Sequence, residues 1–91
     1  QLTLHQNTPN PFNPSTTIRF SVTQASPIRL SVYNTAGQFV RTLVDGTVEA
    51  GTHKAVWDGR DSAGRNVSSG VYLYRLSSTE ETLVRKMLLV R

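Results

Sequence analysis

Short runs of alternating apolar and polar residues recur along the chain, separated by turn-forming residues. In residues 16–23, Ile18, Phe20 and Val22 alternate with polar side chains, which is the period of a strand with one buried face. No window holds a helical period for three turns. The spacing of the runs predicts an all-β sandwich or barrel of about seven strands. The predicted strands are residues 2–5, 16–23, 28–34, 38–44, 52–58, 70–77 and 82–91.

Two stretches interrupt this regular alternation. The apolar spacing in residues 38–44 is irregular, which indicates a bulge or a single helical turn. The turn-forming pairs Asp45–Gly46 and Ala50–Gly51 then predict a loop between two strands, and residues 58–66 form the richest turn segment.

A proline-rich lead-in precedes the first strong strand. Proline fixes φ, lacks an N–H and pushes the preceding residue toward extended geometry. We therefore expect residues 1–15 to be a non-helical lead-in to one domain that spans residues 1–91. The lead-in motif is Pro9, Asn10, Pro11, Phe12, Asn13 and Pro14.

The alternation also predicts which side chains form the core, with Trp57 between the facing sheets. The expected core residues are Ile18, Phe20, Leu30, Val32, Val40, Leu43, Trp57, Tyr72, Tyr74, Leu76, Met87 and Leu89.

The last predicted strand is unusual because it is apolar on both faces. Leu88 and Val90 lie on the face opposite Met87 and Leu89, whereas a sandwich strand normally buries one face and wets the other. Positive charges flank this apolar stretch, at Arg85, Lys86 and Arg91. Two interpretations stay open: a docking element for a partner, or a central strand shielded by the N-terminal segment.

Charge and composition exclude several classes of function. The formal net charge is +4, but the arginines are dispersed, and a nucleic-acid site needs a basic cluster. No apolar run approaches the ~20 residues that cross a bilayer, so we expect neither nucleic-acid binding nor membrane insertion. The absence of cysteine excludes disulfides and thiolate metal sites. With no signal peptide or initiator Met, we expect an excised or processed piece with its boundary at Gln1.

Motifs for catalysis or cofactor binding are also missing. His5 and His53 have no carboxylate at ligand spacing, and there is no phosphate loop, nucleophile elbow or paired-carboxylate motif. We expect no enzyme activity, no catalytic residue, no cofactor and no metal site. Asp58 and Asp61 lack the regular spacing and closing Glu of a calcium loop; an Asx turn is favoured, and weak Ca²⁺ binding is left open.

Three aromatic residues raise the alternative of a sugar-stacking platform, as on β-sandwich carbohydrate-binding modules. Tyr72 and Tyr74 share one face of their strand, and Trp57 lies on a strand of opposite apolar pattern. The pattern favours core packing over carbohydrate binding.

Several sequence blocks follow one another in order along nearly the whole chain. They are residues 9–18, 32–38 with Val40 and Leu43, 50–53, 57–61 with Gly64, 69–76, and 85–87 with the basic final residue. Together these blocks resemble the C-terminal sorting domains of the type IX (Por) secretion system. One departure is the final Arg91, where Lys is common. The stretch from Gly51 to Leu76 is also similar to the immunoglobulin-like domain of the flagellar hook-capping protein.

This resemblance implies an immunoglobulin-like antiparallel β-sandwich that serves as a delivery signal. Such domains lie at the C-terminus of cargo that crosses the outer membrane of certain Gram-negative bacteria, after passage through the periplasm to the surface or medium. The implied partners are type IX translocon or shuttle components, a sortase-like peptidase that cuts upstream of Pro9, and a cargo domain on the same chain. Recognition would fall on Arg85, Lys86, Met87, Leu88, Leu89, Val90 and Arg91.

Two other functions remain as alternatives. The first is a carbohydrate-binding or adhesive module of a secreted enzyme, which an exposed aromatic row would favour. The second is an immunoglobulin-like structural subunit that assembles through its terminal strand. A retained domain could also simply cap the module before it.

Overall fold

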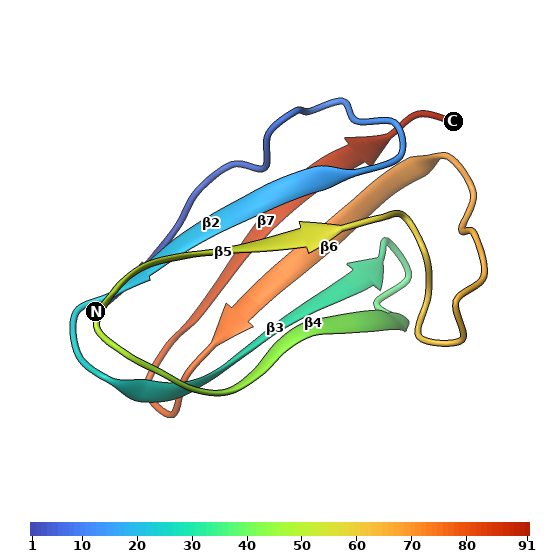
Figure 1. Cartoon of the computed structure of the whole chain (residues 1–91). Coiled ribbons are helices and arrows are strands. Elements are labelled where there is room, and N and C mark those ends of the chain that lie inside the picture. Colours follow the sequence, from blue (N-terminus) through green and yellow to red (C-terminus); the bar gives the residue numbers. More distant parts are fainter.

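The structure is a computed structural model that describes residues 1–91. It contains seven strands and no helix. They form two antiparallel sheets packed face to face (Figure 1), which confirms the expected immunoglobulin-like β-sandwich. The strands are β1 (Leu2–Leu4), β2 (Thr16–Val22), β3 (Ser26–Asn34), β4 (Phe39–Val48), β5 (Gly51–Trp57), β6 (Gly70–Ser77) and β7 (Thr82–Leu89).

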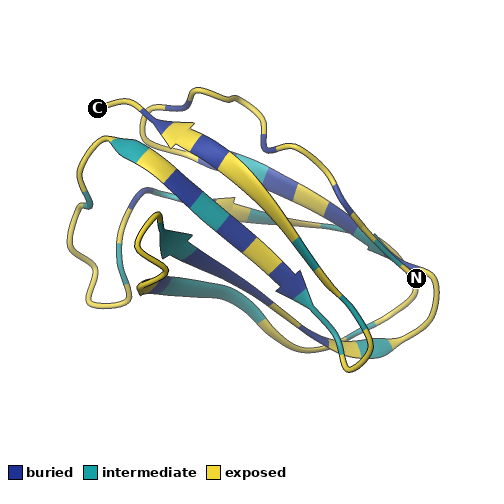
Figure 2. Cartoon of the chain, turned by 180° about the vertical axis from the view of Figure 1, so that it is seen from behind, coloured by how far each residue is buried: buried dark blue, intermediate teal, exposed yellow.

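The two sheets differ in size. One has three strands in the order β1-β2-β5, and the other has four in the order β4-β3-β6-β7. Buried residues alternate with exposed or half-buried ones along β6 and in the second half of β7 (Figure 2), as expected when one face of a sheet covers a core. In the order of the larger sheet, β7 is the outermost strand on one side.

The predicted loop at residues 45–51 is wrong. Strand β4 continues to Val48, because β3 begins as early as Ser26 and the two strands pair from Ser26–Val48 onward. Gly46 fits inside this pairing with a φ of 150°, a value that a glycine adopts readily. Only Glu49 and Ala50 connect β4 to β5. The irregularity expected earlier in β4 is confirmed as register shifts that leave Val40 and Leu43 without a partner residue.

The core follows the predicted pattern closely. Every expected core residue is buried except Leu43, which is half-buried and packs against the others. Trp57 is fully buried, with Tyr72 edge-on at 5.2 Å between ring centroids. Phe12 also packs against Trp57, at 5.7 Å between ring centroids. The pattern missed four buried apolar residues, namely Leu4, Phe12, Val22 and Ile28.

The lead-in crosses from the smaller sheet to the larger one. It leaves β1, forms a bridge to β2 at Thr8–Thr17, and then pairs in parallel with β7 at Phe12–Leu89. The Tyr74 hydroxyl holds the crossing, since it donates to the carbonyl of His5 at 2.7 Å and accepts from the amide of Asn7 at 2.9 Å. Burial raises the pKa of Tyr74, so this hydroxyl keeps its proton. The lead-in is thus an integral part of the sandwich.

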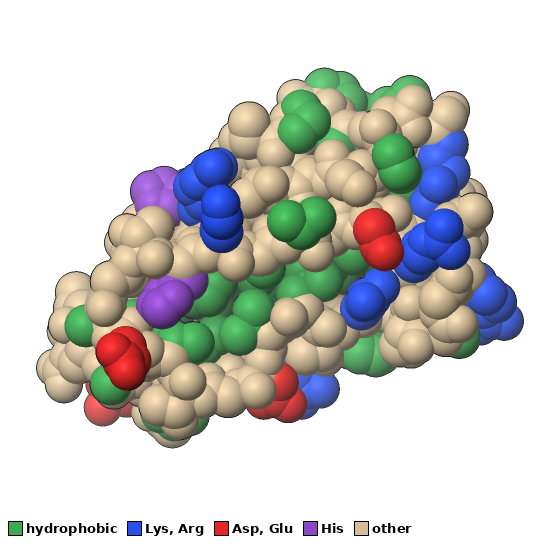
Figure 3. Space-filling view, viewed as in Figure 1, with side chains coloured by type: hydrophobic (Ala, Val, Ile, Leu, Met, Phe, Trp, Pro, Cys, Tyr) green, Lys and Arg blue, Asp and Glu red, His purple; other side chains and the backbone are tan.

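The side of the sandwich opposite the lead-in, between β4 and β5, has no such cover. Figure 3 shows hydrophobic side chains exposed in a hollow between these strands. Half-buried apolar residues of β4 and β5 pack against the core here, namely Leu43, Val44, Val48 and Ala55.

Replacing Trp57 with alanine should destabilise the domain by about 3–5 kcal/mol, because it empties a fully buried site between the two sheets. The adjacent Val56 is 61% exposed, so Val56→Ala should change stability by no more than about 1 kcal/mol. Urea unfolding of both variants measures the difference. Similar losses in the two variants would show that Trp57 is not the central packing residue.

Candidate recognition surface on the terminal strand

The side chains on the inward side of β7 hold this strand to the rest of the domain. Met87 and Leu89 are buried in the core. Arg85 lies on the same side of the strand, and its Nε donates to the carbonyl of Leu4 at 2.6 Å. Three of the seven residues that the resemblance assigns to recognition therefore hold the terminal strand to the rest of the sandwich.

The lead-in also closes the outer edge of β7. The amide of Phe12 donates to the carbonyl of Leu88 at 3.0 Å, and the amide of Val90 donates to the carbonyl of Phe12 at 2.9 Å. Side chains complete the cover: Asn10 Oδ1 accepts from the amide of Leu88 at 3.0 Å, and Gln6 Nε2 donates to the carbonyl of Lys86 at 2.7 Å. The alternative of a central strand shielded by the N-terminal segment is thus confirmed only in that the segment covers this edge: β7 is the outermost strand of its sheet, and Leu88 and Val90 stay exposed. A partner strand therefore cannot extend the sheet along residues 86–90.

The outward face of the same strand is open to solvent. Lys86 is exposed, as are Leu88 (37%) and Val90 (46%). Lys86 lies opposite Leu73 of β6, and Leu88 lies opposite Val71, so apolar neighbours continue onto the next strand. Arg85 and Arg91 are also exposed, but their guanidinium groups are hydrogen-bonded to main-chain carbonyls. Lys86, Leu88 and Val90 are therefore the exposed side chains of the terminal block that have no such role in the fold.

Arg91 serves the fold as well. Its Nε donates to the carbonyl of Val67 at 2.6 Å, its guanidinium also donates to the carbonyl of Gly59, and its amide donates to Ser69 Oγ at 2.9 Å. Charge-assisted bonds of this kind are the stronger hydrogen bonds of proteins. Arg91 therefore ties the C-terminal end of the chain to the loop that follows β5.

That loop is stabilised by its own carboxylates. Asp58 Oδ1 accepts from the amide of Arg60 and from Arg41 Nη1, both at 3.2 Å. Asp61 Oδ1 accepts from the amides of Ala63 and Arg65, which is the expected Asx-turn geometry. The hydrogen bond from the Arg65 amide is the main cause that lowers the pKa of Asp61. Both carboxylates thus have protein donors, and no group of three His, Cys, Asp or Glu side chains lies together as a metal site would require.

The alternative of a sugar-stacking platform formed by Trp57, Tyr72 and Tyr74 is wrong, because these rings are not on the surface. Trp57, Tyr72 and Tyr74 are all buried, and each polar atom of their rings bonds to a main-chain carbonyl: Trp57 Nε1 to Arg60, and the Tyr72 hydroxyl to Ser68. None of the three rings can stack on a ligand. The three rings pack in the core, which confirms the interpretation that the sequence pattern favoured.

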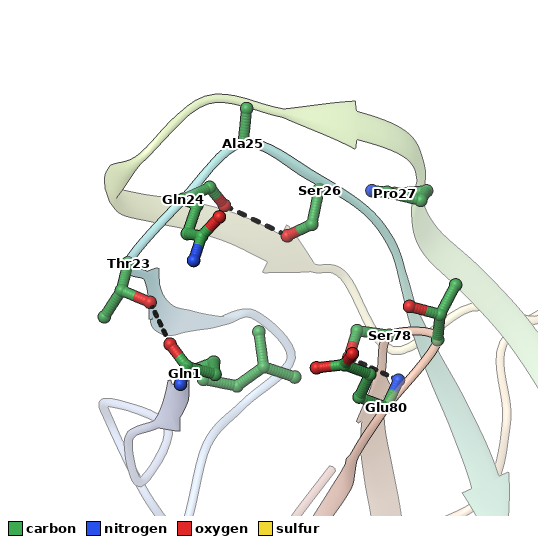
Figure 4. A pocket seen from close by; sticks show the side chains of 10 residues that line it. Gln1, Thr23, Gln24, Ala25, Ser26, Pro27, Ser78 and Glu80 are labelled. Atoms are coloured by element: carbon green, nitrogen blue, oxygen red, sulfur yellow. Dashed lines mark hydrogen bonds between the residues drawn. The ribbon is translucent and has the colours of Figure 1, made fainter.

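A polar recess lies between the β2–β3 turn and the β6–β7 turn (Figure 4), with a volume of about 360 Å³. Hydroxyl and amide side chains line it, including Thr23, Gln24, Ser26 and Ser78. It contains no aromatic ring for a sugar to stack on. This recess adds no support for carbohydrate binding.

The two histidines are far from any catalytic arrangement. His53 stacks on Phe20 at 5.5 Å between ring centroids, and its Nε2 is 2.6 Å from the carbonyl of Glu49. His5 is exposed, and its carbonyl accepts the Tyr74 hydroxyl. The structure has no helix, and so it contains none that could span a membrane.

Comparison with known proteins gives a family and a fold. The family model of the FlgD Ig-like domain matches residues 7–82. No curated protein sequence matches the chain.

Solved structures with similar folds include PorU, PorZ and FlgD. Dimeric latent PorU from Porphyromonas gingivalis aligns with a TM-score of 0.78 at 20% identity over 98% of this chain and 9% of PorU. PorZ, described as an essential surface component of the type-IX secretion system of the same organism, aligns with a TM-score of 0.63 at 23% identity over 97% of this chain and 11% of PorZ. FlgD from Xanthomonas campestris, described in connection with hook capping in flagellar assembly, aligns with a TM-score of 0.66 at 22% identity over 96% and 64%. FlgD from P. aeruginosa aligns with a TM-score of 0.65 at 21% identity over 81% and 57%.

Both likenesses inferred from the sequence therefore have counterparts among solved structures. At these identities the alignments show the fold, and the chain spans about a tenth of PorU and PorZ and about three fifths of the two FlgD proteins. The chain thus has the size of a single domain within each of these relatives.

Gly59 and Gly64 offer a matched test of the Arg91 contact. Both have positive φ, 75° and 81°, so a change to alanine strains each backbone alike. A Cβ on Gly59 would lie 2.7 Å from Arg91 Nη2 and 3.1 Å from the Pro14 carbonyl, whereas a Cβ on Gly64 meets nothing within 4 Å. Gly59→Ala should therefore cost about 1–3 kcal/mol more than Gly64→Ala in urea unfolding. Equal losses would argue against a structural role for Arg91.

Proposed function

We propose that this chain, which belongs to the FlgD Ig-like domain family, is a non-catalytic sorting module at the C-terminus of a secreted protein. It would direct a cargo protein across the outer membrane by the type IX secretion system and deliver it to the cell surface or the medium. The translocon or its shuttle components would recognise the folded domain.

The single observation that carries this proposal is the state of the terminal strand. The edge of β7 is closed by the lead-in, while Lys86, Leu88 and Val90 present an apolar, positively charged surface to solvent. An exposed apolar surface on a small domain marks an interaction site. The sequence blocks shared with type IX sorting domains, and the fold shared with PorU and PorZ, support the choice of system.

The structure bears on the position of the proposed cut by a sortase-like peptidase. A peptidase needs an extended segment that is free of other partners. Residues from Leu2 onward are paired in β1, and Asn7 is buried with hydrogen bonds from its side chain to Pro9 and Thr16. We place the cut before Leu2, upstream of all the paired residues of the lead-in, so that release of cargo leaves the domain intact.

No reaction is assigned to the chain in this proposal. Neither histidine is hydrogen-bonded to a carboxylate, and the two acidic residues of the 58–66 loop accept hydrogen bonds from arginines and main-chain amides.

A second candidate function is a structural module that assembles with copies of itself, because the FlgD relatives share the fold and the outward face of β7 is apolar. Sedimentation at micromolar concentration separates the two: a monomer supports sorting, and oligomers support assembly.

Deletion of Leu83–Arg91 is expected to abolish export, and the double change Lys86→Glu with Arg91→Glu is expected to impair it. The sequence suggests that the double change leaves the fold intact, but the structure shows that neither variant isolates recognition. The deletion removes Met87 and Leu89 from the core, and the change at Arg91 breaks its bonds to Val67 and Gly59. Both would damage the fold. A sharper variant alters only outward side chains.

The double variant Lys86→Glu with Leu88→Asp should reduce delivery of a fused fluorescent reporter to the cell surface by about tenfold or more, because it reverses the charge and removes the apolar contact. The matched control is Lys54→Glu with Val56→Asp, which makes the same kinds of change at the same spacing on exposed positions of β5 in the other sheet. The control should export normally. Equal export by both variants, each folded by circular dichroism, would contradict recognition through the terminal strand.

A further inference from the structure

The exposed apolar surface of β7 continues over part of the outer face of the four-stranded sheet, as far as Phe39 of β4. Strand register places Leu73 between Lys86 on one side and Tyr33 on the other, and Tyr33 lies opposite Phe39 of β4. Of the six large hydrophobic side chains that are exposed, only Val56 belongs to the smaller sheet. We call this surface the outer-face patch; it consists of Tyr33, Phe39, Val71, Leu73, Arg75 and Val84, beside Lys86 and Leu88 of the terminal block.

The two sheets differ in how apolar their outward faces are. Phe39 is 49% exposed and Val71 is 42% exposed, and both lie on the larger sheet. On the smaller sheet the corresponding outward positions of β2 and β5 are polar or charged, apart from Val56. The apolar character is therefore a property of one face of the molecule rather than of its surface in general.

The centre of the outer-face patch is pre-arranged. The Arg75 guanidinium carbon lies 4.5 Å from the centroid of the Tyr33 ring, and Arg75 Nη2 donates to the Tyr33 hydroxyl at 2.6 Å. Phe39 meets the same ring edge-on, at 6.1 Å and 72°. These contacts restrict all three side chains before any partner arrives, which lowers the entropic cost of binding.

The cations of the outer-face patch have no carboxylate partner. The four ion pairs of the structure involve the N-terminus, Arg41, Arg60 and Arg65, and none involves Arg75 or Lys86. An exposed arginine that is stacked on an aromatic ring and has no acidic neighbour is well placed to receive a carboxylate.

We propose that the outer-face patch is a protein-docking surface, and that its partner carries acidic side chains set among apolar ones. This inference rests on the proposed function and deepens it: the terminal strand is one border of a larger interface that extends over β6 and β3 to β4. Arg75 and Lys86 are its two charged contacts, and Phe39 is its most distant apolar contact.

Other occupants fit the surface less well. A sugar stacks on a flat aromatic face, but Tyr33 and Phe39 are tilted by 72° and Arg75 covers one face of Tyr33. A second copy docked face to face would bring Arg75 and Lys86 near the same cations, since a two-fold interface pairs a surface with itself. An acidic, apolar protein surface satisfies both the charges and the apolar contacts.

Site-specific photo-crosslinking tests the extent of the interface. The photoreactive residue p-benzoylphenylalanine replaces Phe39, Leu88 or Val56 in turn, within the reporter fusion expressed in a host with the type IX machinery. We expect positions 39 and 88 to crosslink to the same protein and position 56 to give no crosslink. In parallel, Arg75→Glu should lower the position-39 crosslink and the export of the reporter about tenfold, whereas Arg19→Glu on the outward face of β2 should change neither.

The outcomes separate this inference from the proposed function. Crosslinking from position 88 alone, with normal export of Arg75→Glu, would overturn the wider interface and leave the sorting function standing. Crosslinking from position 39 to a second copy of the chain, or to glycan or lipid rather than protein, would overturn the inference. If neither position 39 nor position 88 crosslinks while the unaltered fusion is exported, recognition lies elsewhere and both ideas fail. Thermal melts of Arg75→Glu and Arg19→Glu confirm that both variants stay folded.

Discussion

The rest of the structure depends on the docking of Phe12 against the terminal strand. Its main chain bonds to Leu88 and Val90, and its ring packs on Trp57, which in turn packs on Tyr72 of the other sheet. One residue of the lead-in thus connects the N-terminal segment, both sheets and β7. Because an uncovered strand edge invites pairing with other chains, this contact also protects the domain from adding strands at its C-terminal side.

Closing the edge of β7 decides which kind of recognition the chain can support. A partner that added a strand would read main-chain groups, but those of residues 86–90 are already bonded to the lead-in. Only side chains on the outer face remain available, and their arrangement depends on strand register. The proposed signal is therefore a surface of the folded domain rather than a linear peptide.

Alternation of apolar and polar residues was enough to predict the strands and most of the core. It failed for Phe12, because the lead-in follows no strand period and its burial arises from a parallel contact with β7. It failed for residues 45–51, because turn-forming pairs were outweighed by the pairing of β4 with β3.

The sequence predicted only part of the candidate site, because several of its residues are placed by contacts that are distant in sequence. The two-faced pattern of the terminal block identified Leu88 and Val90, and β6 carries the same signal at Val71 and Leu73. The role of Arg91 was hidden, since its bonds reach carbonyls 24 and 32 residues away in a loop. The contribution of Phe39 required the register that places it opposite Tyr33. Contacts distant in sequence, not local pattern, determine these parts of the surface.

The central claim is that the folded domain alone is a sufficient sorting signal. The most direct test fuses residues 1–91 to the C-terminus of a fluorescent protein directed to the periplasm, in a host with the type IX machinery and in a mutant that lacks it. We expect fluorescence at the cell surface or in the medium in the competent host only. Retention of the folded fusion in the periplasm of both hosts would contradict the claim.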